Sequence, residues 1–518
     1  MGSILKNTTI ISLGTNLSRI LGLIRDVVIA GLFGTGYGAG AFVVAFTLPN
    51  MLRDFVGEGA ANSAFVPVLT EYKVKKGDKE FWQTASTLLN ILFIALVILS
   101  LLGILLAPVL VRVMAPGFVK EAGAITLTVK LTRVIFPYIF FMGLMAYFMG
   151  VLNTLGHFTA PAFGHCLLNI SLITSAVVLC DEMGPMGLAI GVLAGGILQV
   201  AIQIPVMVKK GFKWVFNFRL SHPAVKKVGL LLAPRLLGTA VYHVNILVDK
   251  MLASLSWIVG YGGIPALYFS YRLIQYPLGI FSTALSTAVL PVMSRHAVKD
   301  DIAKLRDTVS FSLRGIFFIM IPASVGLAVL GRYIIGIIFQ RGAFTGYSTD
   351  ITYTALLFYS IGLFAYGGIR ILATTFYSMN DTRTPVKVAA LALLINVCFN
   401  LILMYPLKIG GLALATSIAA IVNFSVLFII LRKRLNGLED RRIFSALYKV
   451  VIACVPMGII CDTMAKTLLP DPSNAGTLYK VLTLIGIVAC GAGTFFLMSL
   501  ALKMDEAGKI KKWILRRN

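Results

Sequence analysis

Long apolar runs separated by short polar connections recur along the whole chain. Each run approaches the roughly 20 residues that an α-helix needs to cross the hydrocarbon core of a bilayer. A transmembrane β-barrel would show shorter segments of alternating hydrophobicity instead. The pattern predicts fourteen membrane-spanning helices, at residues 9–33, 38–56, 85–110, 128–152, 161–180, 186–208, 227–256, 266–292, 311–331, 351–377, 386–405, 411–431, 443–464 and 479–502.

Two halves of the chain resemble one another at a constant offset of 224 residues. The aligned pairs are AFVPVL (64–69) with AVLPVM (288–293), TAPAF (159–163) with RTPVK (383–387), and GLAIGV (187–192) with GLALAT (411–416). An even number of spans in each unit gives both the same membrane orientation, as in transporters built from parallel repeats. We therefore expect an all-α polytopic membrane protein with an N-lobe (1–210, spans 1–6), a C-lobe (211–434, spans 7–12) and a C-terminal helix pair with a basic tail (435–518).

The composition is typical of a membrane protein. Of the 518 residues, 58% are hydrophobic and 13% are charged, whereas about a quarter of the residues in a soluble domain are charged. The net charge of +25 does not indicate nucleic-acid binding, because the basic residues lie mostly in short connections and no soluble basic module is present. Their bias to one side predicts that the N- and C-termini are both cytoplasmic.

Three charges interrupt the first predicted span, in NLSRILGLIRDVVIAGLFG at 16–34. Charges at bilayer depth cost free energy, so they usually face a cavity or a partner. Arg19 and Asp26 are seven residues apart on one stripe of the helix, and Arg25 is about 120° from Arg19. One interpretation is a structural pairing in which Arg19 and Arg25 neutralise Asp26. The other is a cationic central cavity.

Further arginines lie in spans of both predicted lobes. Span 2 ends in LPNMLRDFVGEG, with Asn50, Arg53 and Glu58, and span 8 carries Arg272 inside its apolar run. Arg53 and Glu58 lie near a helix end and could instead reach the membrane surface or pair locally. Because a guanidinium donates bidentate hydrogen bonds and stays protonated, converging arginines favour an anionic substrate, above all a phosphate or pyrophosphate.

A second group of polar residues is a candidate cation site. Asp249 lies in span 7, Asn396 and Asn400 lie one turn apart in span 11, and Thr416 lies in span 12. A carboxylate with amide and hydroxyl oxygens could hold Na⁺ or relay a proton. The alternative is that Asp249 pairs with Lys250 or another basic residue while the asparagines bond between helices.

Motifs for catalysis and for ATP use are not found in the sequence. GTGYGA at 34–39 has no strand before it and is interpreted as a turn. The five histidines show no metal-ligand spacing, and there is no Walker A motif. We therefore expect a transporter and not an enzyme, with no cofactor, driven by Na⁺, H⁺ or the membrane potential. The six cysteines form no CxxC pair and are interpreted as packing residues: Cys166, Cys180, Cys398, Cys454, Cys461 and Cys490.

Several motifs resemble the MurJ (MviN) family of lipid II flippases, in the multidrug/oligosaccharidyl-lipid/polysaccharide exporter superfamily. They are SRILGLIRD (18–26), LPNMLRDFVGEGAANSAFVPVLTEY (48–72), APGF (115–118), LNTLGHFTAPAF (152–163) and FYSMNDTRTPVK (376–387). The similarity runs from the N-terminus through span 12, and the LPNxLR…EGAxxxAFVPV block is its specific part. The last two spans match mainly in number and hydropathy.

The resemblance implies two six-span lobes and a last helix pair that forms a groove for a lipid tail. It implies that lipid II (undecaprenyl-pyrophosphate-linked disaccharide-pentapeptide) moves from the cytoplasmic to the periplasmic leaflet of a bacterial inner membrane. This role belongs to peptidoglycan synthesis, cell-wall biogenesis and cell shape, with membrane lipids and cell-wall synthesis proteins as further partners. The matching motif positions are Ser18, Arg19, Arg25, Asn50, Arg53, Glu58 and Arg272 for substrate binding, with Asp26 and Pro161 for gating or structure.

Two positions depart from the family pattern. Gly40 stands where we expect an acidic residue at the start of span 2, and Pro265 stands where family members can have a serine before Arg272. Either the cavity rim differs here or gating uses other groups. The main alternative function is export of another lipid-linked oligosaccharide or of drugs within the same superfamily. A membrane enzyme and a non-transporting cell-wall scaffold are less favoured.

Overall fold

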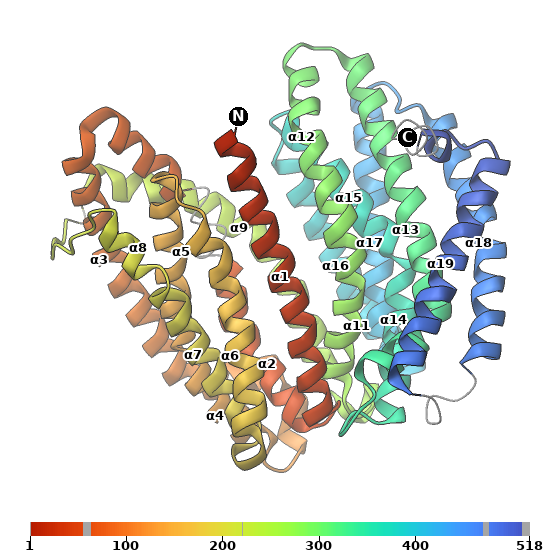
Figure 1. Cartoon of the computed structure of the whole chain (residues 1–518), viewed down its shortest axis with the longest axis horizontal. Coiled ribbons are helices and arrows are strands. Elements are labelled where there is room, and N and C mark those ends of the chain that lie inside the picture. The colour runs from red at the N-terminus through yellow and green to blue at the C-terminus, as the bar shows by residue number, and fades with distance from the viewer. Residues whose placement is uncertain (1, 55–63, 220, 470–475, 510–518) are drawn as a thin grey trace. The chain divides into compact units, whose positions relative to one another are not determined.

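The computed structural model describes residues 2–54, 64–219, 221–469 and 476–509, with side chains except at 2–8, 53, 54, 233–239, 241 and 242. In these ranges the chain is helical and has no strand (Figure 1). Each predicted span overlaps a helix, which confirms the all-α polytopic class. In the described part, ten helices are long and apolar enough to cross a membrane, or eleven if the bent pair α14 (Gly346–Ile361) and α15 (Leu363–Ser378) is counted as one span. The predicted count of fourteen is therefore not confirmed.

The chain forms two compact units, Met1–Leu255 and Ser256–Asn518. The first unit contains α1 (Gly2–Phe33), α2 (Tyr37–Asp54), α3 (Val66–Met114), η3 (Pro116–Lys120), α4 (Ala124–Ile135), α5 (Tyr138–Thr154), α6 (Thr159–Met183), α7 (Pro185–Ala201), α8 (Ile204–Lys209) and α9 (Pro223–Ala253). The second contains α10 (Ser256–Val259), α11 (Gly263–Pro277), η4 (Leu278–Ser282), α12 (Thr283–Val298), α13 (Ile302–Phe339), α14 (Gly346–Ile361), α15 (Leu363–Ser378), α16 (Arg383–Leu407), α17 (Ile409–Arg434), α18 (Asp440–Leu468) and α19 (Thr477–Ala501).

Helix α9 joins the first unit, although the sequence repeat places it first in the C-lobe. It contacts α3, where Lys227 forms an ion pair with Glu71, and Lys250 donates a hydrogen bond to Thr47 of α2. The lobe boundaries at 210 and 434 remain a proposal based on the repeat.

The 224-residue spacing predicted from the sequence recurs in the helix boundaries. Helices α6 and α16 both contain 25 residues, begin 224 residues apart, and carry Pro161 and Pro385 at their third position. Proline is tolerated there because the first turn of a helix has no carbonyl partner for its N–H. Helices α7 and α17 follow after one residue with positive φ, Gly184 at 55° and Lys408 at 52°. The two hairpins therefore share one local geometry.

Glycines at equivalent positions let the two helices of each hairpin touch. A Cβ atom on Gly187 would lie 2.9 Å from Sγ of Cys180, and a Cβ atom on Gly411 would lie 2.1 Å from the backbone oxygen of Leu403. A backbone atom cannot rotate away as a side chain can, so the second hairpin depends more strictly on glycine.

The last two helices pack on α13. Phe318 of α13 lies in a buried apolar cluster with Cys461 of α18 and Phe495 of α19. The segment after α19 is bound to the same helix, because Nη1 of Arg314 lies 2.6 Å from Oε1 of Glu506 and both side chains are buried. All six cysteines are free thiols, and four of them are buried, which agrees with their interpretation as packing residues.

Asp381 lies just before α16, at the polar end of the α16–α17 hairpin. Its carboxylate accepts hydrogen bonds from the backbone N–H groups of Arg383 (3.1 Å) and Thr384 (3.0 Å), and from Nη1 of Arg434 at the end of α17 (2.6 Å). The backbone hydrogen bond from Thr384, with those from the Thr384 hydroxyl and Arg434, lowers the pKa of Asp381 from 3.8 to about 2 against the opposing effect of burial. The ionised carboxylate therefore binds the first turn of α16 to the last turn of α17.

Gly411→Ala should destabilise the protein by about 1–3 kcal/mol or more, because the added methyl group meets backbone of α16. Gly326→Ala is the matched control, since Gly326 lies inside α13 with no atom near the added methyl group. That change should leave stability unchanged or raise it slightly. Thermal unfolding of the purified proteins in detergent measures both, and equal melting temperatures would contradict the close contact.

Asp381→Asn should remove a pH-dependent part of the stability. Because folding lowers the pKa of this carboxyl, its contribution is complete above the unfolded value of 3.8 and is lost as pH falls through about 2. Wild-type melting temperatures measured from about pH 6 downward should fall more steeply in this window than those of Asp381→Asn. The control Asp78→Asn, at an exposed carboxyl on α3, should keep the wild-type slope.

Candidate functional site

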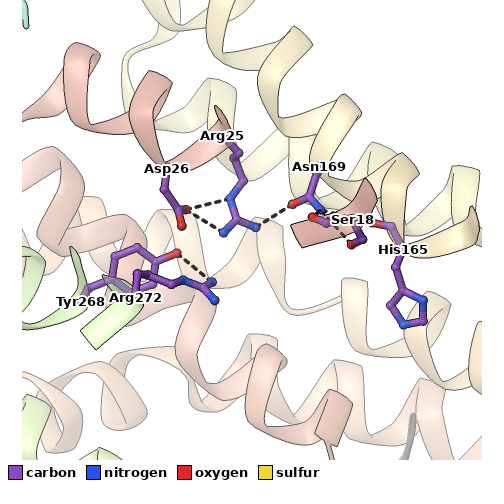
Figure 2. Close-up of polar contacts among 7 residues, drawn as sticks. All are labelled: Ser18, Arg25, Asp26, His165, Asn169, Tyr268 and Arg272. Atoms are coloured by element: carbon purple, nitrogen blue, oxygen red, sulfur yellow. Dashed lines mark hydrogen bonds and ion pairs between the residues drawn. The ribbon is translucent and has the colours of Figure 1, made fainter. Parts of the chain in front are cut away.

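Charged residues of α1 form a buried polar network with α6 (Figure 2). Arg25 is 7% exposed and Asp26 is 2% exposed. Arg25 donates from Nε and Nη2 to Oδ1 of Asp26, at 3.0 and 2.7 Å, and from Nη1 to Oδ1 of Asn169 at 3.0 Å. An ion pair adds no net charge to its surroundings, so α1 can hold both groups among apolar helices.

Asn169 connects two turns of α1 to α6. Its Nδ2 donates to the backbone oxygen of Ser18 at 3.1 Å and to Oγ of Ser18 at 3.3 Å, while its Oδ1 accepts from Arg25 (Figure 2). One amide thus fixes Ser18 and Arg25 together. The sequence analysis did not identify Asn169 as a candidate. The feature that could have identified it is a polar amide inside the apolar run LLNIS at 167–171.

Arg19 lies apart from this network. Its side chain is exposed, and so are the neighbouring apolar residues Leu17 and Ile20. The six-residue separation from Arg25 puts the two arginines on different faces of α1, as the helix geometry predicts. Asp26 forms its ion pair with the adjacent Arg25. The arginine that neutralises Asp26 is therefore not the exposed Arg19.

The remaining candidates of the first unit lie on α2 and α6. Asn50 is half-buried in α2 and Gly40 is buried near the start of the same helix. Pro161 is buried in the first turn of α6. Arg53 belongs to α2, but its side chain lies outside the described residues, and so does the whole of Glu58.

In the second unit, Arg272 lies against an aromatic ring of its own helix. Its guanidinium carbon is 5.1 Å from the ring centroid of Tyr268, and its Nη2 donates to the Tyr268 hydroxyl at 3.1 Å (Figure 2). The face of an aromatic ring attracts a cation, so this contact orients the half-buried guanidinium. Pro265 is buried in the first turn of the same helix, α11.

Three of the four candidate cation ligands lie together. Asn400 donates from Nδ2 to Oδ1 of Asn396 at 2.8 Å, and Asn396 donates from Nδ2 to Oγ1 of Thr416 at 3.2 Å, so α16 and α17 are bound by a buried polar chain. Asp249 lies on α9 of the first unit and accepts a hydrogen bond from Asn245 at 3.4 Å. In the part of the chain that the structure describes, no group of three or more His, Cys, Asp or Glu side chains could hold a metal ion.

The sequence profile of the lipid II flippase MurJ family matches residues 29–469. The chain belongs to the MurJ family. Among its relatives, a Vibrio cholerae protein named "Probable lipid II flippase MurJ" is 34% identical, with 96% of each chain covered. The Burkholderia cenocepacia "Lipid II flippase MurJ" is 33% identical over 81% of this chain and 82% of its own. These matches confirm the resemblance predicted from the motifs.

Solved structures agree with this membership. A structure of a "Lipid II flippase MurJ, inward closed conformation" matches with a TM-score of 0.78 and 27% identity, covering 96% of this chain and 99% of its own. A multidrug resistance MATE family transporter of the MOP superfamily, in an inward-facing conformation, matches with a TM-score of 0.70 and 16% identity over 82% of this chain and 96% of its own. That second match shows the fold alone. The many apolar helices and the MurJ membership identify a multi-pass membrane protein.

Asp26→Asn should destabilise the protein by about 3 kcal/mol, because it leaves a buried arginine without its counter-charge. The double variant Arg25→Gln/Asp26→Asn should recover part of this loss, since no unpaired charge remains. Thermal unfolding in detergent measures the difference. Asp462→Asn is the control, because it breaks an exposed ion pair with Lys466 that should contribute less than about 1 kcal/mol. Equal melting temperatures for Asp26→Asn and wild type would argue against a structural pair.

Proposed function

We propose that this member of the MurJ family flips lipid II from the cytoplasmic to the periplasmic leaflet of the bacterial inner membrane. The observation that carries the proposal is the family match across residues 29–469, joined to arginines within otherwise apolar helices. Because unpaired charge is costly at membrane depth, arginines there need a function or a partner. The polar headgroup of a lipid that must cross the bilayer would be such a partner.

The pyrophosphate of lipid II is the part of the substrate that suits these arginines. A guanidinium offers a planar fork of donors that fits phosphate oxygens and keeps its charge in a low-dielectric site. The described arginines differ in availability: Arg19 is exposed, Arg272 is half-buried on a tyrosine ring, and Arg25 is engaged by Asp26. We infer that Arg19 and Arg272 make the first contacts and that Arg25 turns a guanidinium N–H toward the phosphate without giving up its ion pair with Asp26.

Alternating access is the mechanism that the internal repeat supports. The matching geometry of the α6–α7 and α16–α17 hairpins favours two lobes that move as rigid bodies about the substrate. The excess of Lys and Arg in alternate connections favours cytoplasmic N- and C-termini. We infer that α18 and α19 provide the path for the lipid tail.

An inside-negative membrane potential could drive the cycle, since roughly 2.3 kcal/mol per charge per 100 mV favours outward movement of an anion. The chain of Asn396, Asn400 and Thr416 offers neutral oxygens to Na⁺, and the Asp249 carboxylate on α9 is a separate candidate for relaying a proton. Coupling to Na⁺ or H⁺ is therefore a second part of the proposal. Cell-wall synthesis proteins are the expected consumers of the flipped lipid.

Complementation tests the flippase proposal. A bacterium depleted of its own lipid II flippase should grow when this chain is expressed. Arg19→Ala and Arg272→Ala should fail to support growth at normal membrane levels, because a lost charge-assisted hydrogen bond of about 1.5–3 kcal/mol lowers substrate affinity by roughly 10- to 100-fold. Arg25→Ala and Arg53→Ala should be tested beside them.

Arg332→Ala is the matched control, since it removes an arginine whose exposed side chain pairs with Asp350 at 2.9 Å. It should support growth as wild type does. If all arginine variants support growth equally, the arginines are structural and the substrate site lies elsewhere. If the wild-type chain is present in the membrane and does not support growth, export of another lipid-linked oligosaccharide becomes the better proposal.

A further inference from the structure

The connection between α8 and α9 exposes three aromatic side chains at alternate positions, with a basic side chain at each end. Its central stretch, KWVFNFR at 213–219, is here called the interfacial segment. Trp214, Phe216 and Phe218 are exposed, with Phe216 at 79%, and the Phe216 and Phe218 rings pack edge to face with centroids 4.8 Å apart. Large exposed aromatic groups on a membrane protein are typical of the boundary between lipid headgroups and acyl chains.

A buried asparagine on α3 holds the interfacial segment in place. Asn90 donates from Nδ2 to the backbone oxygens of Val215 (2.8 Å) and Asn217 (3.2 Å), and its Oδ1 accepts from Nε1 of Trp214 at 2.7 Å. Ser86 adds a longer hydrogen bond to the backbone oxygen of Lys213, at 3.4 Å. These hydrogen bonds therefore fix the backbone of the interfacial segment and the Trp214 ring against α3.

The position of Asn90 along α3 places the segment at the membrane surface. One turn after Asn90, the exposed apolar face of α3 begins at Ile94 and continues through Ile98 and Leu105. Before Asn90, the same helix carries the basic run of residues 73–79, which belongs in water. An exposed apolar face this long on a spanning helix belongs against lipid. The interfacial segment thus lies where α3 passes from water into hydrocarbon.

A shallow pocket of about 490 Å³ joins the segment to α3 at this level. Ile91 and Ile94 of α3 line it together with Phe218, Arg219 and Ser221. Its lining combines apolar side chains with the residues that carry a guanidinium and a hydroxyl, Arg219 and Ser221. This combination matches a phospholipid, whose phosphate accepts hydrogen bonds beside the first carbons of its acyl chains.

The surrounding charge selects an anionic lipid. Exposed basic groups precede and follow the aromatic residues, at Lys209, Lys210, Lys213 and Arg219, and the sequence contains no acidic residue between Glu182 and Asp249. The acidic groups that α3 brings to this connection act beyond the aromatic residues, Glu80 on His222 and Glu71 on Lys227. Clustered Lys and Arg at a membrane surface attract anionic headgroups.

We propose that the interfacial segment and α3 bind an anionic phospholipid of the adjacent leaflet. Arg219 and Ser221 hold the headgroup phosphate, Ile91 and Ile94 lie along the acyl chain, and Phe216 inserts at the interface. This site involves none of the residues assigned above to lipid II, so it stands or falls independently of the flippase proposal.

Depth measurement tests the insertion. A nitroxide label on Phe216→Cys would be compared with one on Val74→Cys, an equally exposed position (79%) within the basic run of α3. The full-length protein, with exposed Cys398 and Cys490 replaced by Ser and Ala, would be placed in nanodiscs of phosphatidylethanolamine and phosphatidylglycerol. The label at 216 should collide mainly with dissolved oxygen and the label at 74 mainly with a water-soluble nickel complex. Equal nickel accessibility at both positions would overturn the insertion.

Native mass spectrometry tests the headgroup site. Wild-type protein released from the same nanodiscs should retain phosphatidylglycerol, and Arg219→Gln should lower the retained fraction about fivefold, the effect of one basic group at an anionic surface. Lys299→Gln is the matched control, since it removes an exposed charge in the α12–α13 connection. Arg219 is exposed, so its loss should not impair folding, and an unchanged melting temperature would verify this. Equal retention in wild type and Arg219→Gln would overturn the lipid site.

Discussion

The buried ion pair of Arg25 and Asp26 sets the polar centre of the first unit. Two charges on adjacent residues of an apolar helix can be buried only if each has a partner, and here they serve one another while Asn169 takes the remaining edge of the guanidinium. The need to give both charges a partner fixes α1 against α6, because the Asn169 amide of α6 also binds the backbone oxygen of Ser18 on α1. Farther along the interface, a Cβ atom on Gly14 would lie 2.7 Å from a backbone oxygen of α6. The direction of Arg19 follows from this fixed packing.

Duplication explains why the second unit reuses the same local solutions. The α16–α17 hairpin repeats the length, the third-position proline and the positive-φ joint of α6–α7. Its polar chemistry differs: the first hairpin presents Asn169 to an arginine of α1, whereas the second joins Asn396, Asn400 and Thr416 within the hairpin. A shared backbone with different polar groups is the expected result when one half of a duplicated fold is adapted to a separate task.

Periodic apolar runs predicted the helices well, because lipid exposure and packing both demand apolar side chains. They predicted the ends less well. Helix α3 extends over 49 residues, past the membrane run into a lysine-rich stretch bent at Gly77, and sequence hydropathy has no signal for a helix that continues into water. The helix wheel separated Arg19 from Arg25 correctly. The structural pair with Asp26, one of the two interpretations of the sequence, is found for Arg25 and not for Arg19. The sequence did not reveal that Asn169 completes the network, since contacts between helices depend on packing that one sequence does not display.

The pairing of Arg25 has a consequence for the release of an anion. An arginine that binds pyrophosphate in a low-dielectric site without an alternative partner would hold it too tightly, because release would leave a bare buried charge. Under the proposed function Asp26, 2.7 Å from the guanidinium, keeps Arg25 neutralised whether or not the anion is bound, so release leaves no bare charge at this position. Arg272 has a weaker equivalent in the ring of Tyr268, which attracts a cation without neutralising it. Under the proposed function, a graded set of arginines, from exposed Arg19 to neutralised Arg25, would bind a phosphate strongly enough to move it and weakly enough to let it go.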